Sequence, residues 1–214
     1  MGDIVGLSLA VSVSATLAAA MLGIPLAALL ALWRFPGRRA LVVGVNALLG
    51  LPPVVVGLAL YLTLSSSGPL GGLRLLYTPG AMVIAQTALA TPIVAALAHR
   101  ALEQAWAAYG PALRVLGATR LRAVPTLLAL SRRHVVTAVL AGFGRTISEV
   151  GAVLIVGGNI AGFTRTMTTS VALETGMGHL ERALAIGLVL VGISLAASAC
   201  ILALSDRAEG GPTA

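Results

Sequence analysis

Residues 4–33, IVGLSLAVSVSATLAAAMLGIPLAALLALW, form an unbroken run of 30 side chains without a charge. A helix of about 20 apolar residues crosses the hydrocarbon core of a bilayer, so this run is long enough to span a membrane. Apolar residues make up 58% of the 214-residue chain and charged residues only 10%. Soluble domains carry about 25% charged residues. The composition therefore indicates an integral membrane protein and excludes an ordinary soluble enzyme or a soluble nucleic-acid-binding protein.

Four further apolar stretches are long enough to cross a bilayer, so we expect an all-α membrane protein with five transmembrane helices. These helices would form one transmembrane domain over residues 1–208, followed by a polar tail at 209–214 that we expect to be disordered. The expected spans are residues 4–33, 40–64, 80–98, 135–156 and 183–204.

The arginines set the expected orientation of these spans. All 14 basic residues are arginines, and nine of them lie in the connections after the first and third spans. The connections after the second and fourth spans hold only three. Because cytoplasmic loops collect Lys and Arg, the Arg-rich connections are expected in the cytoplasm. The protein would then lie in the cell membrane with its N-terminus outside the cell and its C-terminus in the cytoplasm.

The connection between the third and fourth spans, residues 99–134, is too apolar in places to be a flexible linker. Residues 102–106 and 112–124 are expected to form two short helices, separated by a break at 109–111. Pro111 is tolerated in the first turn of a helix. Such a helix pair fits either docking to a partner protein or an interfacial position on anionic lipid.

Part of this connection resembles a known family. Residues 111–118, PALRVLGA, are similar to the EAA loop of ABC importer permeases, in which Glu-Ala-Ala is followed after three residues by Gly. Ala112 and Gly117 match that pattern, whereas Pro111 and Leu113 replace the Glu and the second Ala. Residues 51–57 (LPPVVVG) and 142–153 (GFGRTISEVGAV) resemble the molybdate, sulfate and tungstate branch, and the tungstate-type permeases most closely.

This resemblance implies a permease homodimer that carries an oxyanion by alternating access, with tungstate as the expected cargo and molybdate or sulfate as alternatives. It also implies two cytoplasmic ATPase subunits, which would bind ATP-Mg, and an extracytoplasmic oxyanion-binding protein. The chain has no Walker-type Gly-rich loop, so no enzymatic activity and no bound cofactor are expected in this chain itself. The expected ATPase-coupling residues are Pro111, Ala112, Leu113, Leu116, Gly117, Ala118 and Thr119.

Two charged residues interrupt the fourth span. Arg145 and Glu149 are four positions apart and therefore share one face of a helix. A charge near the middle of the membrane costs about 2.5–3.5 kcal/mol on insertion scales, and pairing lowers this cost. Two interpretations stay open. In the first, Arg145 helps the anion to cross while Glu149 holds the Arg145 side chain in place. In the second, the pair is structural and locks two helices together.

Polar residues of the third span offer a second set of candidates. Gln86, Thr87 and Thr91 could line the translocation pathway and donate hydrogen bonds to an oxyanion, or they could join helices by interhelical hydrogen bonds. In the second span, Pro52 and Pro53 remove two consecutive backbone donors and predict a kink. This kink could serve a gate or only shape the packing.

The connection after the fourth span holds Asn159, Thr164 and Arg165. A short helix beginning near Thr164 could dip toward the pathway as an external gate, or the segment could be an ordinary solvated loop.

Other site types are excluded by spacing. The three histidines are too dispersed for a metal site. Ser148 and His134 would lie about 21 Å apart on one helix and cannot form a protease dyad. No catalytic or metal-binding residue is therefore predicted, and the arginines lack the interleaved aromatic residues of a nucleic-acid-binding surface.

The alternative function from another class is a membrane scaffold that transports nothing and recruits a cytoplasmic partner through its Arg-rich loop.

Overall fold

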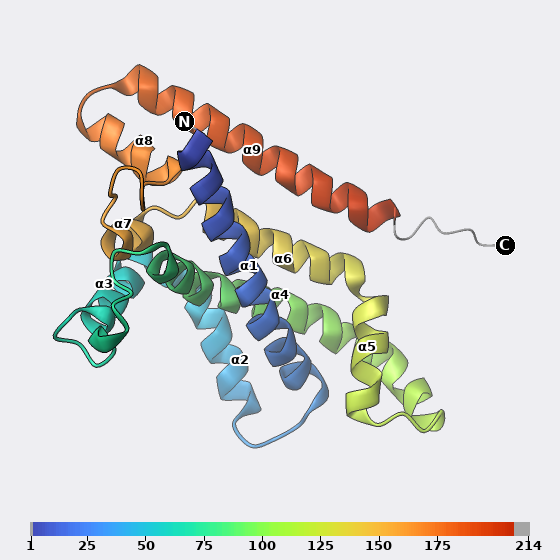
Figure 1. Ribbon diagram of the computed structural model, residues 1–214. Coiled ribbons are helices and arrows are strands. Elements are labelled where there is room, and N and C mark those ends of the chain that lie inside the picture. Colours follow the sequence, from blue (N-terminus) through green and yellow to red (C-terminus); the bar gives the residue numbers. More distant parts are fainter. Residues whose placement is uncertain (1, 208–214) are drawn as a thin grey trace.

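The computed structural model describes residues 2–207, and every regular element in that range is a helix. Three long helices form its frame: α1 (Gly2–Leu32), α4 (Pro79–Val115) and α9 (Leu180–Arg207) (Figure 1). Each is long and apolar enough to cross a membrane. The expected all-α membrane architecture is therefore confirmed, while the expected tail at 209–214 lies outside the described residues.

Two further apolar segments are broken rather than straight. The first consists of α2 (Arg38–Ala47), a short 3₁₀ turn η1 (Leu48–Gly50) and α3 (Pro53–Leu64), with a bend of 102°. The second consists of α6 (Arg132–Ile147) and α7 (Gly151–Gly157), with a bend of 57°. If each bent pair forms one span, the described residues contain up to five spans.

Consecutive prolines account for the larger bend. Leu51 and Pro52 each precede a proline, and a proline disfavours the helical conformation of the residue before it. Both residues are extended, with ψ angles of 125° and 122°. Pro53 then begins α3, where its missing N–H would have had no helical partner.

Small residues allow α1 and α4 to pack closely. Ala15, Ala19, Gly23 and Ala27 recur every four residues on one face of α1, and the three alanines are fully buried. A Cβ added at Gly23 would lie 3.1 Å from the backbone nitrogen of Ala95 in α4. Such close backbone approach is typical of membrane helices, whose association relies on van der Waals contact rather than on the hydrophobic effect.

The connection between α4 and α6 differs from the sequence-based expectation. The break expected at residues 109–111 is wrong, because α4 continues through Gly110 and Pro111 to Val115. Gly110 is buried beneath the Trp106 ring, from which an added Cβ would be only 3.0 Å away. Packing of this turn outweighs the one hydrogen bond that Pro111 cannot donate.

The chain instead turns at Gly117, so the single helix expected over 112–124 is also wrong. Gly117 has a φ angle of +76°. Its N–H donates to Arg114 O (3.0 Å), and the N–H of Ala118 donates to Leu113 O (2.9 Å). These two bonds form a Schellman cap, which needs the left-handed conformation that glycine adopts readily. Helix α5 (Arg120–Leu130) begins after this cap.

The last two helices form the outer edge of the molecule. Helix α8 (Met167–Gly176) leads into α9, which runs along one side of the molecule (Figure 1). The side chains of Leu184, Leu188 and Leu195 on α9 are about two-thirds exposed. An apolar surface of this kind is suited to contact with lipid or with another apolar protein surface.

Candidate functional site

The break between α6 and α7 holds an ion pair. Arg145 Nη1 lies 2.8 Å from Glu149 Oε2, and the Arg145 side chain is 29% exposed whereas that of Glu149 is 2% exposed. The second carboxylate oxygen, Oε1, accepts a hydrogen bond from Ala152 N (2.9 Å) at the first turn of α7. The backbone oxygen of Glu149 accepts from Thr168 Oγ1 of α8 (2.9 Å).

These contacts give the two charged residues different tasks. Both carboxylate oxygens of Glu149 are occupied, and the residue connects α6, α7 and α8. Arg145 retains further N–H donors on a guanidinium that is partly exposed and held in place. The ion pair joins the end of α6 to the break before α7, so the structural interpretation and a role of Arg145 in anion passage are both compatible with this geometry.

The two helix breaks lie beside each other. A Cβ added at Gly151 would lie 3.0 Å from Val54 Cγ2, and one added at Gly57 would lie 2.8 Å from Ala152 Cα. Helices α3 and α7 therefore start together and pack against each other (Figure 1). The arrangement brings the segment that follows Pro52 and Pro53 against the segment that follows Arg145 and Glu149.

The polar residues of α4 point to other helices and to their own backbone. Gln86 Nε2 donates to Thr146 O of α6 (2.9 Å), and Thr87 Oγ1 donates to Ala15 O of α1 (3.4 Å). Thr91 Oγ1 donates to Thr87 O (2.7 Å). Gln86 Oε1 is buried and accepts no hydrogen bond from the part of the chain that the structure describes. Of the two sequence-based interpretations, interhelical hydrogen bonding describes the geometry of Gln86 and Thr87.

A polar stripe on α1 belongs to the same seam and was missed from the sequence. Thr16 Oγ1 lies 3.0 Å from Thr146 Oγ1, and Thr146 Oγ1 donates to Ser12 O (3.3 Å). Ser8 Oγ accepts a hydrogen bond from Met167 N (2.8 Å) at the start of α8. Ser8, Ser12 and Thr16 are four residues apart in an apolar helix, and this spacing was the signal that could have identified them.

The residues expected at an external gate lie in a tight loop before α8. Thr164 is fully buried, and its Oγ1 donates to Gly157 O (2.5 Å) and accepts from Ile160 N (2.9 Å). Arg165 Nε donates to Asn159 Oδ1 (3.3 Å). The short helix expected near Thr164 begins at Met167, because the side chain of Thr166 caps it.

Arg165 also faces a cavity between α8 and α9 that the sequence did not reveal. Arg182 of α9 and Ser170 of α8 line the same cavity, together with Glu174. The Ser170 hydroxyl is buried and has no hydrogen-bond partner among residues 2–207. Two guanidinium groups and an unpartnered hydroxyl can donate hydrogen bonds to an anion. Arg182 lies 17 positions after Arg165, and the sequence alone does not predict that the two line one cavity.

The expected coupling residues are divided among three structural contexts. Pro111, Ala112 and Leu113 lie in the last turns of α4, and Leu113 packs against the core that includes Leu102. Leu116, Gly117 and Ala118 form the cap at the end of α4. Thr119 is the N-cap of α5, and its Oγ1 accepts from Arg122 N (3.4 Å). Leu116 is 81% exposed, and nearby Val115 and Leu121 are 87% and 72% exposed. The turn therefore presents an apolar tip formed by Val115, Leu116 and Leu121.

Within residues 2–207, no group of three or more His, Cys, Asp or Glu side chains is placed to hold a metal ion. What the structure offers is an anchored arginine beside two helix breaks, an arginine-lined cavity between α8 and α9, and an exposed apolar tip on the connection between α4 and α6.

The amino-acid sequence is similar to those of transport proteins. No protein-family model matches the chain. A probable anion ABC transporter permease protein of Haloferax volcanii is 38% identical over 213 residues, which cover 97% of this chain and 92% of the relative. The tungstate uptake system permease protein TupB of Peptoclostridium acidaminophilum is 39% identical over 204 residues, which cover 95% of this chain and 90% of the relative. The molybdenum transport system permease protein ModB of Escherichia coli K12 is 31% identical over 216 residues, which cover 95% of this chain and 94% of the relative.

Proposed function

The chain belongs to the tungstate and molybdate branch of the ABC transporter permeases, a family of multi-pass membrane proteins, and we propose that it carries tungstate into the cell by alternating access. Two relatives named for tungstate are 39% and 37% identical to it. Relatives named for molybdenum are 31% and 32% identical. This difference supports tungstate over molybdate, and molybdate and sulfate are the alternative cargoes.

In this proposal each bent helix pair is one span, which gives five spans with the N-terminus outside and the C-terminus inside. The position of the arginines supports this topology. Arg34 and Arg38, after the first span, line one cavity with Arg114 and Arg120, after the third. The two Arg-rich connections therefore lie at the same end of the molecule, as a common cytoplasmic location requires.

The proposed transporter contains two copies of this chain, two cytoplasmic ATPase subunits that bind ATP-Mg, and an extracytoplasmic binding protein that delivers the oxyanion. The single observation that carries the coupling to an ATPase is the exposed apolar tip formed by Val115, Leu116 and Leu121. A partner surface that buries such side chains gains about 1.5–3 kcal/mol for each of them. The rigid Gly117 cap would transmit movement of the partner directly to α4.

The proposed pathway passes the break between α6 and α7. Its support is the Arg145 guanidinium, which Glu149 holds in place while other donors remain free for an anion. The adjacent breaks before α3 and α7 would serve as hinges at which the two spans bend. The arginine-lined cavity between α8 and α9 would receive the anion on the outer side.

The test is reconstitution of the chain with its ATPase and binding protein in proteoliposomes. We expect tungstate-loaded binding protein to raise the rate of ATP hydrolysis and to drive uptake of tungstate, measured by elemental mass spectrometry. An unchanged hydrolysis rate together with absent uptake would favour the rival function, a scaffold that only recruits the cytoplasmic partner.

A variant of the apolar tip tests the coupling surface. Leu116→Ser should weaken the stimulation of ATP hydrolysis about tenfold, since loss of about 1.4 kcal/mol of contact energy corresponds to a factor of ten. Leu130→Ser is the control, because Leu130 is also exposed (54%) but lies at the far end of α5. Equal stimulation by both variants would show that the tip is not the coupling surface.

A further inference from the structure

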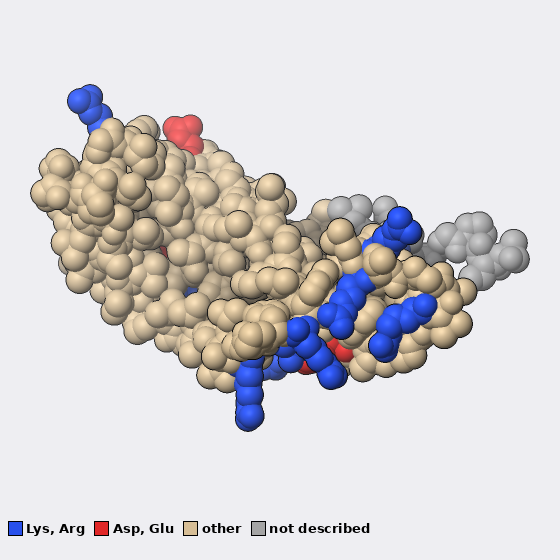
Figure 2. Space-filling view, turned by 90° about the horizontal axis from the view of Figure 1, so that it is seen from below, with Lys and Arg blue, Asp and Glu red and all other residues tan. Residues whose placement is uncertain are grey.

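A cavity of about 480 Å³ lies at the Arg-rich end of the molecule, enclosed by the end of α1, the start of α2, α4 and the start of α5. Its size falls within the range of about 300–1,000 Å³ that is typical of ligand pockets. Figure 2 shows basic side chains gathered on this part of the surface, with acidic side chains between them. Its charged lining residues are Arg34, Arg38, Glu103, Arg114 and Arg120.

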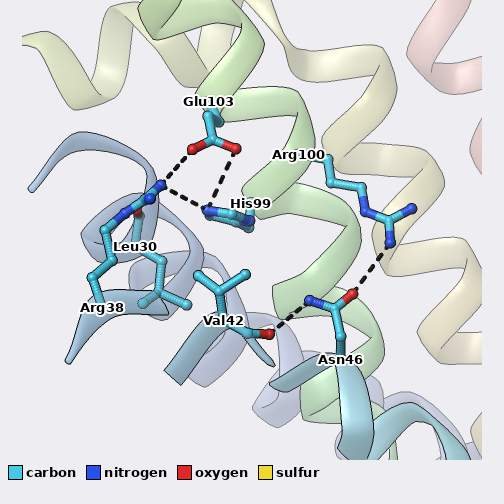
Figure 3. A network of polar contacts seen from close by, with 7 residues as sticks. All are labelled: Leu30, Arg38, Val42, Asn46, His99, Arg100 and Glu103. Carbon is cyan, nitrogen blue, oxygen red and sulfur yellow. Dashed lines mark hydrogen bonds and ion pairs between the residues drawn. The ribbon is translucent and has the colours of Figure 1, made fainter. Parts of the chain in front are cut away.

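One of these four arginines is already neutralised. Arg38 forms an ion pair with Glu103 through Nη2, and its Nε donates to Leu30 O (2.6 Å), as Figure 3 shows. The buried ring of His99 adds a contact between its Nε2 and Arg38 Nη2 (3.4 Å). Glu103 is the only carboxylate among the described residues that lines the cavity, and it pairs with Arg38.

The other three guanidinium groups have no carboxylate partner among residues 2–207. Arg114 Nε donates to Gly110 O (3.3 Å), and its guanidinium lies 5.6 Å from the Trp106 ring centroid. Neither contact supplies a negative charge. Arg34 and Arg120 are exposed and make no ion pair with any described residue. Three like charges that face one cavity repel one another, and an anion between them would relieve this repulsion.

We propose that this cavity binds a phosphate-type oxyanion, either the phosphodiester of an anionic phospholipid or a free tetrahedral oxyanion. Guanidinium groups match such oxygens because each presents a planar fork of N–H donors. Trp106 adds an amphipathic ring of the kind that concentrates at the headgroup level of membranes, and this favours the lipid as the source. The proposal does not rest on the proposed transport function, although the cavity shares Pro111 with the expected coupling residues.

The experiment uses Trp106 as the reporter. The chain has two tryptophans, and Trp33→Phe leaves Trp106, which lines the cavity, as the only one. The purified full-length protein in detergent is titrated with dihexanoyl phosphatidylglycerol, dihexanoyl phosphatidylcholine, potassium phosphate or sodium tungstate at constant ionic strength. We expect a saturable fluorescence change with phosphatidylglycerol and an apparent affinity several-fold weaker for phosphatidylcholine, whose choline cation opposes the arginines.

Matched double variants separate the cavity from the overall charge. Arg34→Gln with Arg120→Gln should weaken binding at least tenfold, whereas Arg39→Gln with Arg122→Gln should leave it unchanged. Both pairs remove two charges from the same two segments, but Arg39 and Arg122 do not line the cavity. Arg34→Lys with Arg120→Lys keeps the two positive charges but removes the planar set of guanidinium N–H donors, and it should give an intermediate affinity. Circular dichroism checks that each variant is folded.

Each outcome has a defined meaning. Saturation by phosphatidylglycerol but not by phosphate or tungstate supports the site with a lipid as its source, and saturation by the free oxyanions supports it with a soluble source. Native mass spectrometry of the bound molecule gives a readout that does not depend on fluorescence. The absence of saturable binding by every anion, or equal weakening in both glutamine double variants, overturns the proposal.

Discussion

At the scale of single residues, Glu149 is more constrained than its partner Arg145. The carboxylate is almost fully buried and uses one oxygen for Arg145 and the other for Ala152 N. The Arg145 side chain is 29% exposed, so its guanidinium depends less on its partner than the buried carboxylate does. A buried charge that loses its partner is strongly destabilising, whereas a neutral replacement can keep the hydrogen bond.

This asymmetry predicts the stability of the variants. Arg145→Gln should lower the melting temperature more than Glu149→Gln, because it leaves a buried carboxylate without a cation. The full cost of breaking a buried pair is about 3–5 kcal/mol, and the partial exposure of Arg145 reduces it. Adding Glu149→Gln to Arg145→Gln should restore most of the lost stability. Thermal unfolding of the purified protein in detergent measures all three variants.

Tungstate uptake by the same double variant distinguishes the two roles of Arg145. If stability returns and uptake stays absent, Arg145 acts on the anion, and if both return, the pair is structural. A double variant that is no more stable than Arg145→Gln alone would contradict the argument from the buried carboxylate.

The spacing of Arg145 and Glu149 was enough to predict a shared face. It could not reveal that Glu149 caps α7, because capping depends on where the helix breaks. The roles of Gln86 and Thr87 also stayed open in the sequence, since their partners Thr146 and Ala15 are 60 and 72 positions away. Residue type indicates that a buried amide or hydroxyl needs a partner, but only packing decides which one.

At the scale of helices, local signals and packing compete. The pair Gly110–Pro111 predicted a break, yet the contact of Trp106 with Gly110 and the burial of this turn keep α4 continuous. The real turn uses Gly117 alone, because a left-handed residue is needed there. Pro52 and Pro53 bend the segment as the sequence predicted, because each disfavours the helical conformation of the residue before it.

The contact between α3 and α7 gives a prediction at this scale. Gly57→Ala places a Cβ 2.8 Å from Ala152 Cα, and backbone cannot move aside as a flexible side chain can. The two helices must separate, so the variant should lose about 1–3 kcal/mol, the usual cost of overpacking. Fluorescence-detected size-exclusion chromatography after heating measures the shift of the melting temperature.

Gly44→Ala is the matched control, because Gly44 lies within α2 and nothing is within 4 Å of an added Cβ. Replacing glycine by alanine inside a helix stabilises it by about 0.5–1 kcal/mol, so its melting temperature should stay the same or rise. Equal melting temperatures for the two variants would mean that α3 and α7 are free to separate.

At the scale of the whole molecule, composition and span length sufficed to predict an all-α membrane protein. They could not predict how the helices pack, because an apolar helix such as α9 has no preferred face in its sequence. The exposed leucines of α9 and the buried alanines of α1 belong to stretches of similar hydropathy. On α1, the small residues Ala15, Ala19, Gly23 and Ala27 face α4 and permit close contact with it.

The distribution of charge predicts the orientation of the molecule in the membrane. Nine of the 14 arginines lie in the two connections after the first and third spans, and the structure brings arginines of both connections to one cavity. Reversing the orientation would move this charge to the outer side, against the positive-inside rule. Impermeant maleimide labelling of single cysteines tests this prediction, starting from Cys200→Ser, which removes the chain's one cysteine.

Two exposed positions report the two sides. Val115→Cys, at a position that is 87% exposed on the apolar tip, should react only after the membrane is disrupted, since it is expected to face the cytoplasm. Leu73→Cys, at a position that is 58% exposed in the connection between α3 and α4, should react in intact spheroplasts. The opposite pattern would place the apolar tip outside the cell, where no ATPase could reach it. Transport would then require a different source of energy, because the surface proposed for coupling would face the binding protein instead.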